Sequence, residues 1–236
     1  MKKYITLAIN LIRYNLKIIF AGKFFWFLLA AFVVFGYVMF SMAWDRAEIN
    51  EGAIYRILLF PCLLLIFYPA VFGIQNDEDN RILEIIFGIP NYRYKVWGLR
   101  MLMVYVANFF ILMIFAYIAR FLLYPVHIAE MAAQLIFPML FFGNLAFMFS
   151  TITRSGNGTA VIMIIIGLVF SIFMNSVDFI RNSFWNAFLN PFTIPTGIHP
   201  MIWQNIIIKS RIFLFLGGVV FLMFGLLNLQ KREKFM

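Results

Sequence analysis

The sequence predicts an all-α integral membrane protein with six transmembrane helices. Apolar residues make up 64% of its 236 residues and charged residues 12%, against about 45–50% and roughly 25% in an ordinary globular domain. A chain of this composition has too little polar surface to cover a fold in water. Its apolar residues also gather into runs of about 20, the length that crosses the hydrocarbon core of a bilayer.

These runs divide the chain into six spans within a single transmembrane domain, residues 1–236. We expect the spans at residues 24–44, 53–74, 101–123, 131–153, 158–177 and 212–229. The spans and their short connections use up the chain, so no separate soluble domain is expected.

Residues 1–22 form the first of two segments that differ from the spans. Apolar residues recur there mostly at steps of three and four, while Lys3, Arg13 and Lys17 fall on the opposite face of a helix. This pattern predicts a helix lying in the headgroup layer. The alternative is a polar extension of the first span.

Residues 178–211 are the second such segment. They are rich in aromatic residues and are interrupted by Pro191, Pro195 and Pro200. We expect short re-entrant or interfacial helices there, because aromatic rings favour the membrane surface. The alternative is a loose interfacial loop.

The distribution of positive charge predicts the orientation of the chain. Most of the 19 lysines and arginines fall on one side if both termini are cytoplasmic, as the positive-inside rule requires. This N-in, C-in arrangement places residues 75–100 in the cytoplasm. It also accounts for the net charge of +9 without a nucleic-acid partner.

The sequence shows no pattern typical of an enzyme. It has no Gly-rich phosphate loop ending in Lys-Ser or Lys-Thr and no helical His-Glu-x-x-His. A metal site is not expected, because His127 and His199 are far apart, and the lone Cys62 excludes an intramolecular disulfide. Few ionisable residues fall in mid-span, which disfavours a proton- or ion-coupled carrier.

The polar stretch of residues 75–100 is the candidate functional segment. We expect a helix over residues 77–87 that begins with Asp77, Glu78 and Asp79, since the helix macrodipole favours negative charge at that end. The residues that follow are too apolar for a free solvated helix, and Pro90 ends it. Such a helix suits docking into a groove on another protein. The alternative is an ordinary charged loop with an interfacial helix.

This stretch resembles the loop between spans two and three of ABC-2 type transporter permeases. Their pattern of an acidic cluster, a glutamate, an apolar run, a proline and a basic residue is matched by residues 77–79, Glu84, residues 85–87, Pro90 and Arg100. The sequence departs from the family at Arg81 and Ile82, where Gly-Thr is usual, and at Arg100, where lysine is usual. The order of the spans and residues 190–192 (Asn-Pro-Phe) resemble the family too.

The resemblance implies the transport subunit of an exporter in a bacterial cytoplasmic membrane. Two copies of a separate subunit would bind and hydrolyse ATP with Mg²⁺, and a second permease copy or a paralogue would complete the complex; this chain itself would hold no cofactor. Coupling to the ATPase is implied for Asp77, Glu78, Asp79, Glu84, Ile86, Pro90, Arg93 and Arg100. An external gate or re-entrant role is implied for Trp185, Asn190, Pro191 and Phe192.

The cargo is open at this level. The aromatic, apolar spans suit an amphipathic or hydrophobic cargo such as a peptide, a bacteriocin or a drug-like molecule. The alternatives are an exporter of lipid or lipid-linked glycan, and a channel or secondary carrier that uses no ATPase. An intramembrane enzyme or a scaffold for membrane assembly is a third reading.

Overall fold

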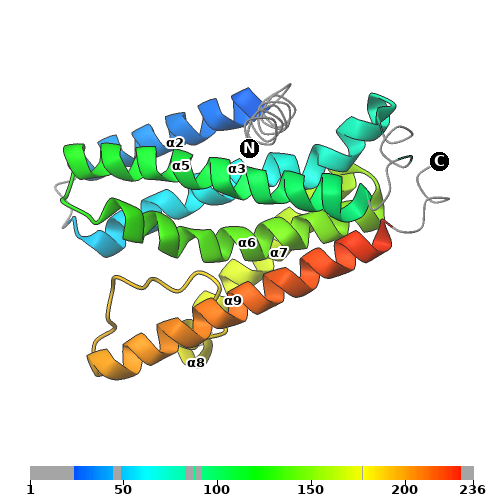
Figure 1. Ribbon diagram of the computed structural model, residues 1–236. Coiled ribbons are helices and arrows are strands. Elements are labelled where there is room, and N and C mark those ends of the chain that lie inside the picture. Colours follow the sequence, from blue (N-terminus) through cyan, green and yellow to red (C-terminus); the bar gives the residue numbers. More distant parts are fainter. Residues whose placement is uncertain (1–23, 45–48, 83–87, 89–91, 177, 230–236) are drawn as a thin grey trace, which may run out of the picture.

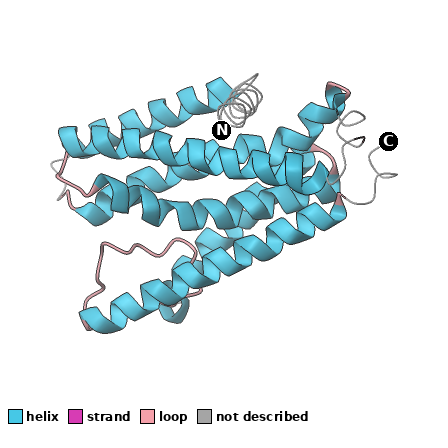
Figure 2. Cartoon of the chain, viewed as in Figure 1, coloured by secondary structure: helices cyan, strands magenta, loops and turns pink. Residues whose placement is uncertain are grey.

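The computed structural model describes residues 24–44, 49–82, 88, 92–176 and 178–229 as a bundle of helices. No strand occurs among these residues (Figure 2). The helices are α2 (Phe24–Trp44), α3 (Glu51–Asp79), the π-helix η1 (Arg93–Gly98), α5 (Leu99–Leu122), α6 (Ile128–Thr153), α7 (Gly156–Ser176), α8 (Asp178–Arg181) and α9 (Pro200–Asn228).

The predicted all-α fold with six candidate spans is confirmed for the described residues. Six of the helices, with η1 and α5 together forming the third, are long and apolar enough to cross a membrane. The chain therefore has the make-up of a multi-pass membrane protein. The helix predicted for residues 1–22 lies outside the described residues.

α6 lies at the centre of the bundle and packs against α9, α3, α5 and α7 (Figure 1). It is the most buried of the six candidate spans, whereas α2 and α7 are mostly exposed. Large apolar side chains such as Phe25 and Val33 on α2 and Ile165 on α7 point outward and are more than half exposed. Lipid is the solvent that such apolar surfaces require.

The contact between α6 and α9 depends on a close backbone approach. A Cβ atom added at Gly218 of α9 would lie 3.2 Å from the carbonyl oxygen of Leu140 on α6. Small residues are the usual means of bringing helices together in lipid, where no hydrophobic effect drives them into contact.

Two helices differ in extent from the predicted spans. α3 continues past residue 74 to Asp79, so the acidic residues 77–79 end this helix instead of beginning a separate one. α9 begins at Pro200 and not near residue 212, so residues 200–211, predicted as part of a broken segment, belong to a continuous helix. Proline at the first position of α9 explains this start, because its missing N–H is not needed there.

The helices alternate in direction, so the connections between them lie at the two ends of the bundle (Figure 1). One end, called here the α3 end, holds the end of α3, η1 and the start of α5, the connection from α6 to α7, and the end of α9. The opposite end, called here the loop end, holds residues 182–199 between α8 and α9 together with the starts of α3, α6 and α9.

Candidate functional site

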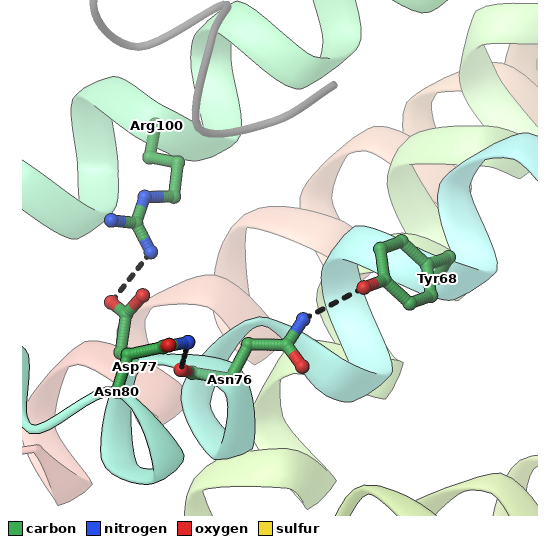
Figure 3. A network of polar contacts seen from close by, with 5 residues as sticks. All are labelled: Tyr68, Asn76, Asp77, Asn80 and Arg100. Atoms are coloured by element: carbon green, nitrogen blue, oxygen red, sulfur yellow. Dashed lines mark hydrogen bonds and ion pairs between the residues drawn. The ribbon is translucent and has the colours of Figure 1, made fainter. Parts of the chain in front are cut away.

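A buried ion pair joins α3 to α5 at the α3 end. Arg100 Nη1 donates a hydrogen bond of 2.7 Å to Asp77 Oδ2 (Figure 3). Asp77 is only 3% exposed and Arg100 only 8%. Because burial removes both charges from water, each needs the other, and removing one partner would leave an uncompensated charge. The pair therefore fixes the position of the last turn of α3 relative to the first turn of α5.

An aromatic residue of η1 completes the surroundings of Arg100. The guanidinium carbon lies 4.6 Å from the ring centroid of Trp97, close enough for an attractive cation–π contact. The Trp97 ring in turn packs on Phe147 of α6, with 6.0 Å between centroids. The ion pair is thus connected to the central helix of the bundle through Trp97.

Amide side chains extend this network along the end of α3. Asn76 Nδ2 donates to the hydroxyl oxygen of Tyr68 at 2.9 Å, and Asn80 Nδ2 donates to the backbone carbonyl of Asn76 at 2.5 Å (Figure 3). Arg81, the next residue, has a positive φ of 55°. α3 therefore stays helical to Asp79 and turns sharply just beyond it.

Two further hydrogen bonds tie α3 to α6 and α7. Ser150 Oγ of α6 donates to the carbonyl oxygen of Val71 at 2.9 Å, and the backbone N–H of Gly156 donates to Gln75 Oε1 at 2.6 Å. A Cβ atom at Gly156 would lie 2.3 Å from Phe72 Cδ1, so only glycine fits there. The end of α3 is consequently fastened to three other helices by polar contacts.

α9 joins the same end of the bundle. Asn228 Nδ2 donates to the carbonyl oxygen of Thr151 on α6 at 2.6 Å. The hydroxyl of the buried Tyr92, just before η1, donates to the carbonyl oxygen of Leu229. Residues 92–100 therefore contact both α3 and the end of α9.

The predicted coupling residues divide into four groups. Asp77 and Arg100 are buried against each other, whereas Glu78 and Asp79 are exposed on the same turn of α3. Arg93 is partly buried, with its guanidinium carbon 5.4 Å from the Tyr94 ring centroid. Glu84, Ile86 and Pro90 lie outside the described residues.

Of the predicted gate residues, Asn190 and Phe192 contact the start of α3, whereas Trp185 contacts α9. Asn190 Nδ2 donates to the carbonyl oxygen of Gly52 at 2.8 Å, and its Oδ1 accepts from the N–H of Phe192 at 3.0 Å. The Phe192 ring packs on Tyr55 with 5.8 Å between centroids. Pro191 is partly buried between these contacts, and Trp185 packs on Phe213 of α9 with 5.0 Å between centroids.

Arg211 of α9 is a buried residue at the end of residues 178–211, the segment for which short re-entrant or interfacial helices were predicted. Its Nε donates to Gln134 Oε1 of α6 at 2.8 Å, and its Nη2 contacts the Tyr55 hydroxyl at 3.3 Å and the Leu189 carbonyl oxygen at 3.2 Å. It thus links α9, α6, α3 and the loop. An arginine directly before the long apolar run of this helix is the sequence signal that could have identified it.

Comparison with protein-family models, with curated proteins and with solved structures finds no match to this chain. Chemically, the described residues include no group of three or more His, Cys, Asp or Glu side chains that could hold a metal ion. At the α3 end, polar contacts join the helix that carries the exposed acidic turn to α5, α6 and α7.

Proposed function

We propose that this chain is the transmembrane subunit of an ATP-driven exporter of the ABC-2 permease type, with both termini in the cytoplasm of a bacterium. The observation that carries the proposal is the Asp77–Arg100 ion pair at the α3 end. It joins the two helices on either side of the polar stretch that resembles the coupling segment of that family. The resemblance of residues 77–100 and the excess of positive charge on one side support the proposal.

Force applied to this stretch would reach the bundle through the contacts of α3. Glu78 and Asp79 are exposed near the beginning of this stretch, so they are suited to meet a basic surface on the ATP-binding subunit. A displacement of α3 would reach α5 through Asp77 and α7 through Gln75. It would reach α6 through the carbonyl oxygen of Val71. The ATPase would bind ATP and Mg²⁺, and this chain would change between inward- and outward-facing states.

The cargo that we propose is amphipathic or hydrophobic, such as a peptide, a bacteriocin or a drug-like molecule. An apolar cavity of about 130 Å³ between α3, α6 and α7 supports an apolar contact surface in mid-membrane; Ile66, Phe142, Met163 and Phe188 are among its lining residues. Export of a lipid or a lipid-linked glycan is the second candidate, because the same surface faces the acyl-chain region.

Charge reversal of the exposed acidic turn tests the proposal. The full-length chain is purified in mild detergent together with a candidate ATP-binding cassette subunit, and the ratio of the two subunits, the ATPase activity and transport in vesicles are measured. We expect Glu78→Arg combined with Asp79→Arg to release the ATPase or to uncouple hydrolysis from transport. Glu130→Arg, an exposed reversal at the start of α6 on the loop end, serves as the matched control.

Two results would contradict the proposal. One is transport by the purified chain in vesicles without any ATP-binding subunit, which would indicate a channel or secondary carrier. The other is full ATPase binding and coupled transport by the doubly reversed variant, which would place the coupling contact elsewhere.

A further inference from the structure

Two spaces in the bundle lie on either side of one loop residue, Phe188. The first is the apolar cavity of about 130 Å³ between α3, α6 and α7, and the second is a polar hollow of about 450 Å³ at the loop end. Among the described residues, Phe188 is the only one that lines both spaces. The direct path between them therefore runs past this side chain.

The two spaces differ in their surroundings. Apolar side chains such as Ile66, Phe142 and Met163 border the cavity, and all three are buried. An apolar cavity of this kind stays free of water. The hollow is bordered by exposed polar residues, Thr193 and Thr196 among them, so water enters it from the loop end. Phe188 thus stands at the boundary between a dry space and a wet one.

The ring of Phe188 reaches the middle of the bundle. It stacks on the ring of Phe142, with 5.2 Å between the centroids and 9° between the planes. Phe142 in turn lies near the middle of α6, which runs from Ile128 to Thr153. A ring placed across a narrow apolar passage excludes water, as hydrophobic constrictions do in channels.

Hydrogen bonds hold the main chain on both sides of Phe188. Its N–H donates to Asn186 Oδ1 at 2.9 Å, and the carbonyl oxygen of the next residue, Leu189, accepts from Arg211 Nη2 at 3.2 Å. The Leu189 N–H also donates to the Asn186 carbonyl oxygen at 3.2 Å. Because these contacts fix the main chain, the ring can turn about its own side-chain bonds while the loop stays in place.

The cavity also reaches the outer surface of the bundle beside α7. Ile164 and Gly167 border it there, and Ile164 is 55% exposed. A Cβ atom added at Gly167 would meet no atom beyond its own helix backbone within 4 Å. If the six helices cross a membrane, this surface faces acyl chains. An apolar group can therefore enter the cavity from the membrane without passing through water.

We infer that Phe188 is the barrier of an exit path that leads from the membrane beside α7, through the cavity, to the hollow at the loop end. The cavity is about as large as one that holds benzene, so the cargo is an amphipathic molecule with an apolar group of single-ring size. Its polar part enters the hollow when the Phe188 ring turns aside. As a step of export this inference rests on the proposed function, whereas the barrier to water does not.

Access of a water-soluble thiol reagent to the cavity tests the barrier without any ATPase. Ala146 of α6 lines the cavity and is only 2% exposed. Ala146→Cys, in a chain whose native thiol is removed by Cys62→Ala, therefore places one thiol in the cavity. The purified full-length chain is held in lipid nanodiscs, where both ends of the bundle face water. The rate of modification by a sulfonated, membrane-impermeant methanethiosulfonate is then measured.

We expect this thiol to react slowly while Phe188 is present, because water and reagent are both excluded. Adding Phe188→Ala joins the cavity to the hollow and should raise the rate about tenfold or more, which corresponds to a barrier lower by about 1.4 kcal/mol. Phe188→Trp keeps a ring in the passage and should leave the rate low. Phe188→Leu, which still packs on Phe142, should raise the rate by less than Phe188→Ala and carries the test if Phe188→Ala does not fold.

Phe184 provides the matched control in the same loop. Its ring packs on Trp185 with 4.6 Å between centroids and borders neither space. Phe184→Ala therefore removes a ring of the same size without opening the path, and the rate should stay low. An equal rise in Phe184→Ala would indicate a general loosening of the loop and would overturn the inference. Rapid reaction with Phe188 in place, or no rise in the Phe188→Ala and Phe188→Leu chains, would overturn it as well.

Transport measured with an ATP-binding subunit separates this inference from the proposed function. A faster thiol reaction in Phe188→Ala, in a chain that shows no ATP-driven transport, would support the barrier and contradict the proposed function. ATP-driven transport together with an unchanged thiol reaction in Phe188→Ala would support the proposed function and overturn the barrier.

Discussion

At the scale of single residues, the Asp77–Arg100 pair shows how this fold handles charge. Both side chains are almost fully buried, and the oxygen–nitrogen distance is 2.7 Å. Such a pair contributes less to stability than its Coulomb attraction implies, because both ions lose their hydration. The pair instead specifies one arrangement of α3 and α5, because any displacement of one helix relative to the other would separate two buried charges.

The first prediction concerns this pair. We expect Asp77→Ala to lower the free energy of unfolding by about 3 kcal/mol or more, because Arg100 would keep a buried charge without its partner. Arg100→Met should cost a similar amount, whereas the double variant should cost clearly less than the sum of the two. Unfolding in detergent, followed by the Tm and by denaturant titration, measures these differences.

A neighbouring acidic residue provides the control for that experiment. Glu78→Ala changes an exposed carboxylate on the same turn of α3 and should shift stability by no more than about 0.5 kcal/mol. If the loss of stability in the double variant equals the sum of the losses in Asp77→Ala and Arg100→Met, the two side chains do not act as a pair.

At the scale of helices, the existence of each span is predictable from composition, and its ends are not. Hydropathy places the end of the second span near residue 74, where Gln75, Asn76 and Asp77 begin the polar stretch. The helix continues because partners satisfy those side chains. Gln75 accepts from Gly156 of α7, Asp77 pairs with Arg100 of α5, and Asn76 donates to Tyr68 on α3 itself. The partners of Gln75 and Asp77 are too distant in sequence to leave a local signal.

The start of α9 was mispredicted for a related reason. Lys209 and Arg211 interrupt its apolar run, so hydropathy places the start of the span after them. The buried Arg211 is accommodated by Gln134 and Tyr55 from other helices. Of the three prolines in residues 178–211, only Pro200 begins a helix, and sequence alone does not distinguish it from Pro191 or Pro195.

The candidate site was predicted only in part for similar reasons. The sequence identified Asp77 and Arg100 as members of one polar stretch, but it did not indicate that they form a buried pair. Trp97 and Tyr92 were missed altogether, because aromatic residues are common throughout this chain and their contacts with Arg100 and Leu229 depend on the tertiary fold.

The second prediction tests the contact between α3 and α7. In Gly156→Ala the new methyl group would meet the Phe72 ring at 2.3 Å and Gln75 Oε1 at 2.6 Å, so these side chains of α3 or the start of α7 must shift. We expect a loss of about 1–3 kcal/mol in stability, the usual cost of overpacking. If the α3 end transmits force as proposed, coupled transport should fall as well.

The matched control lies two positions along the same helix. A Cβ atom at Gly158 would come no closer than 3.6 Å to Ser155, which is an ordinary contact distance. Gly158→Ala should therefore be neutral or slightly stabilising, because alanine favours the helix. Equal losses in the two variants would show that helix propensity, and not packing against α3, determines the effect.

At the scale of the whole molecule, the two ends of the bundle must face opposite sides of the membrane if the six helices cross it. α3 runs directly from Gly52, which binds the loop at Asn190, to Asp77, which binds Arg100. The loop end and the α3 end are therefore separated by the full length of α3, and an α-helix rises about 1.5 Å per residue. The proposed orientation assigns the α3 end to the cytoplasm and the loop end to the exterior.

The last prediction concerns this orientation, and the single native cysteine makes it simple to test. Cys62 is fully buried, and its Sγ contacts the carbonyl oxygen of Leu135 at 3.4 Å, so the unmodified chain should resist a membrane-impermeant maleimide. Asp79→Cys and Thr196→Cys each place one thiol at an exposed position, the first at the α3 end and the second at the loop end. We expect intact cells to label only the Thr196→Cys chain, and inside-out vesicles only the Asp79→Cys chain. The reverse pattern would put the α3 end outside, where no ATP-driven subunit could reach it, and would contradict the proposed coupling together with the orientation.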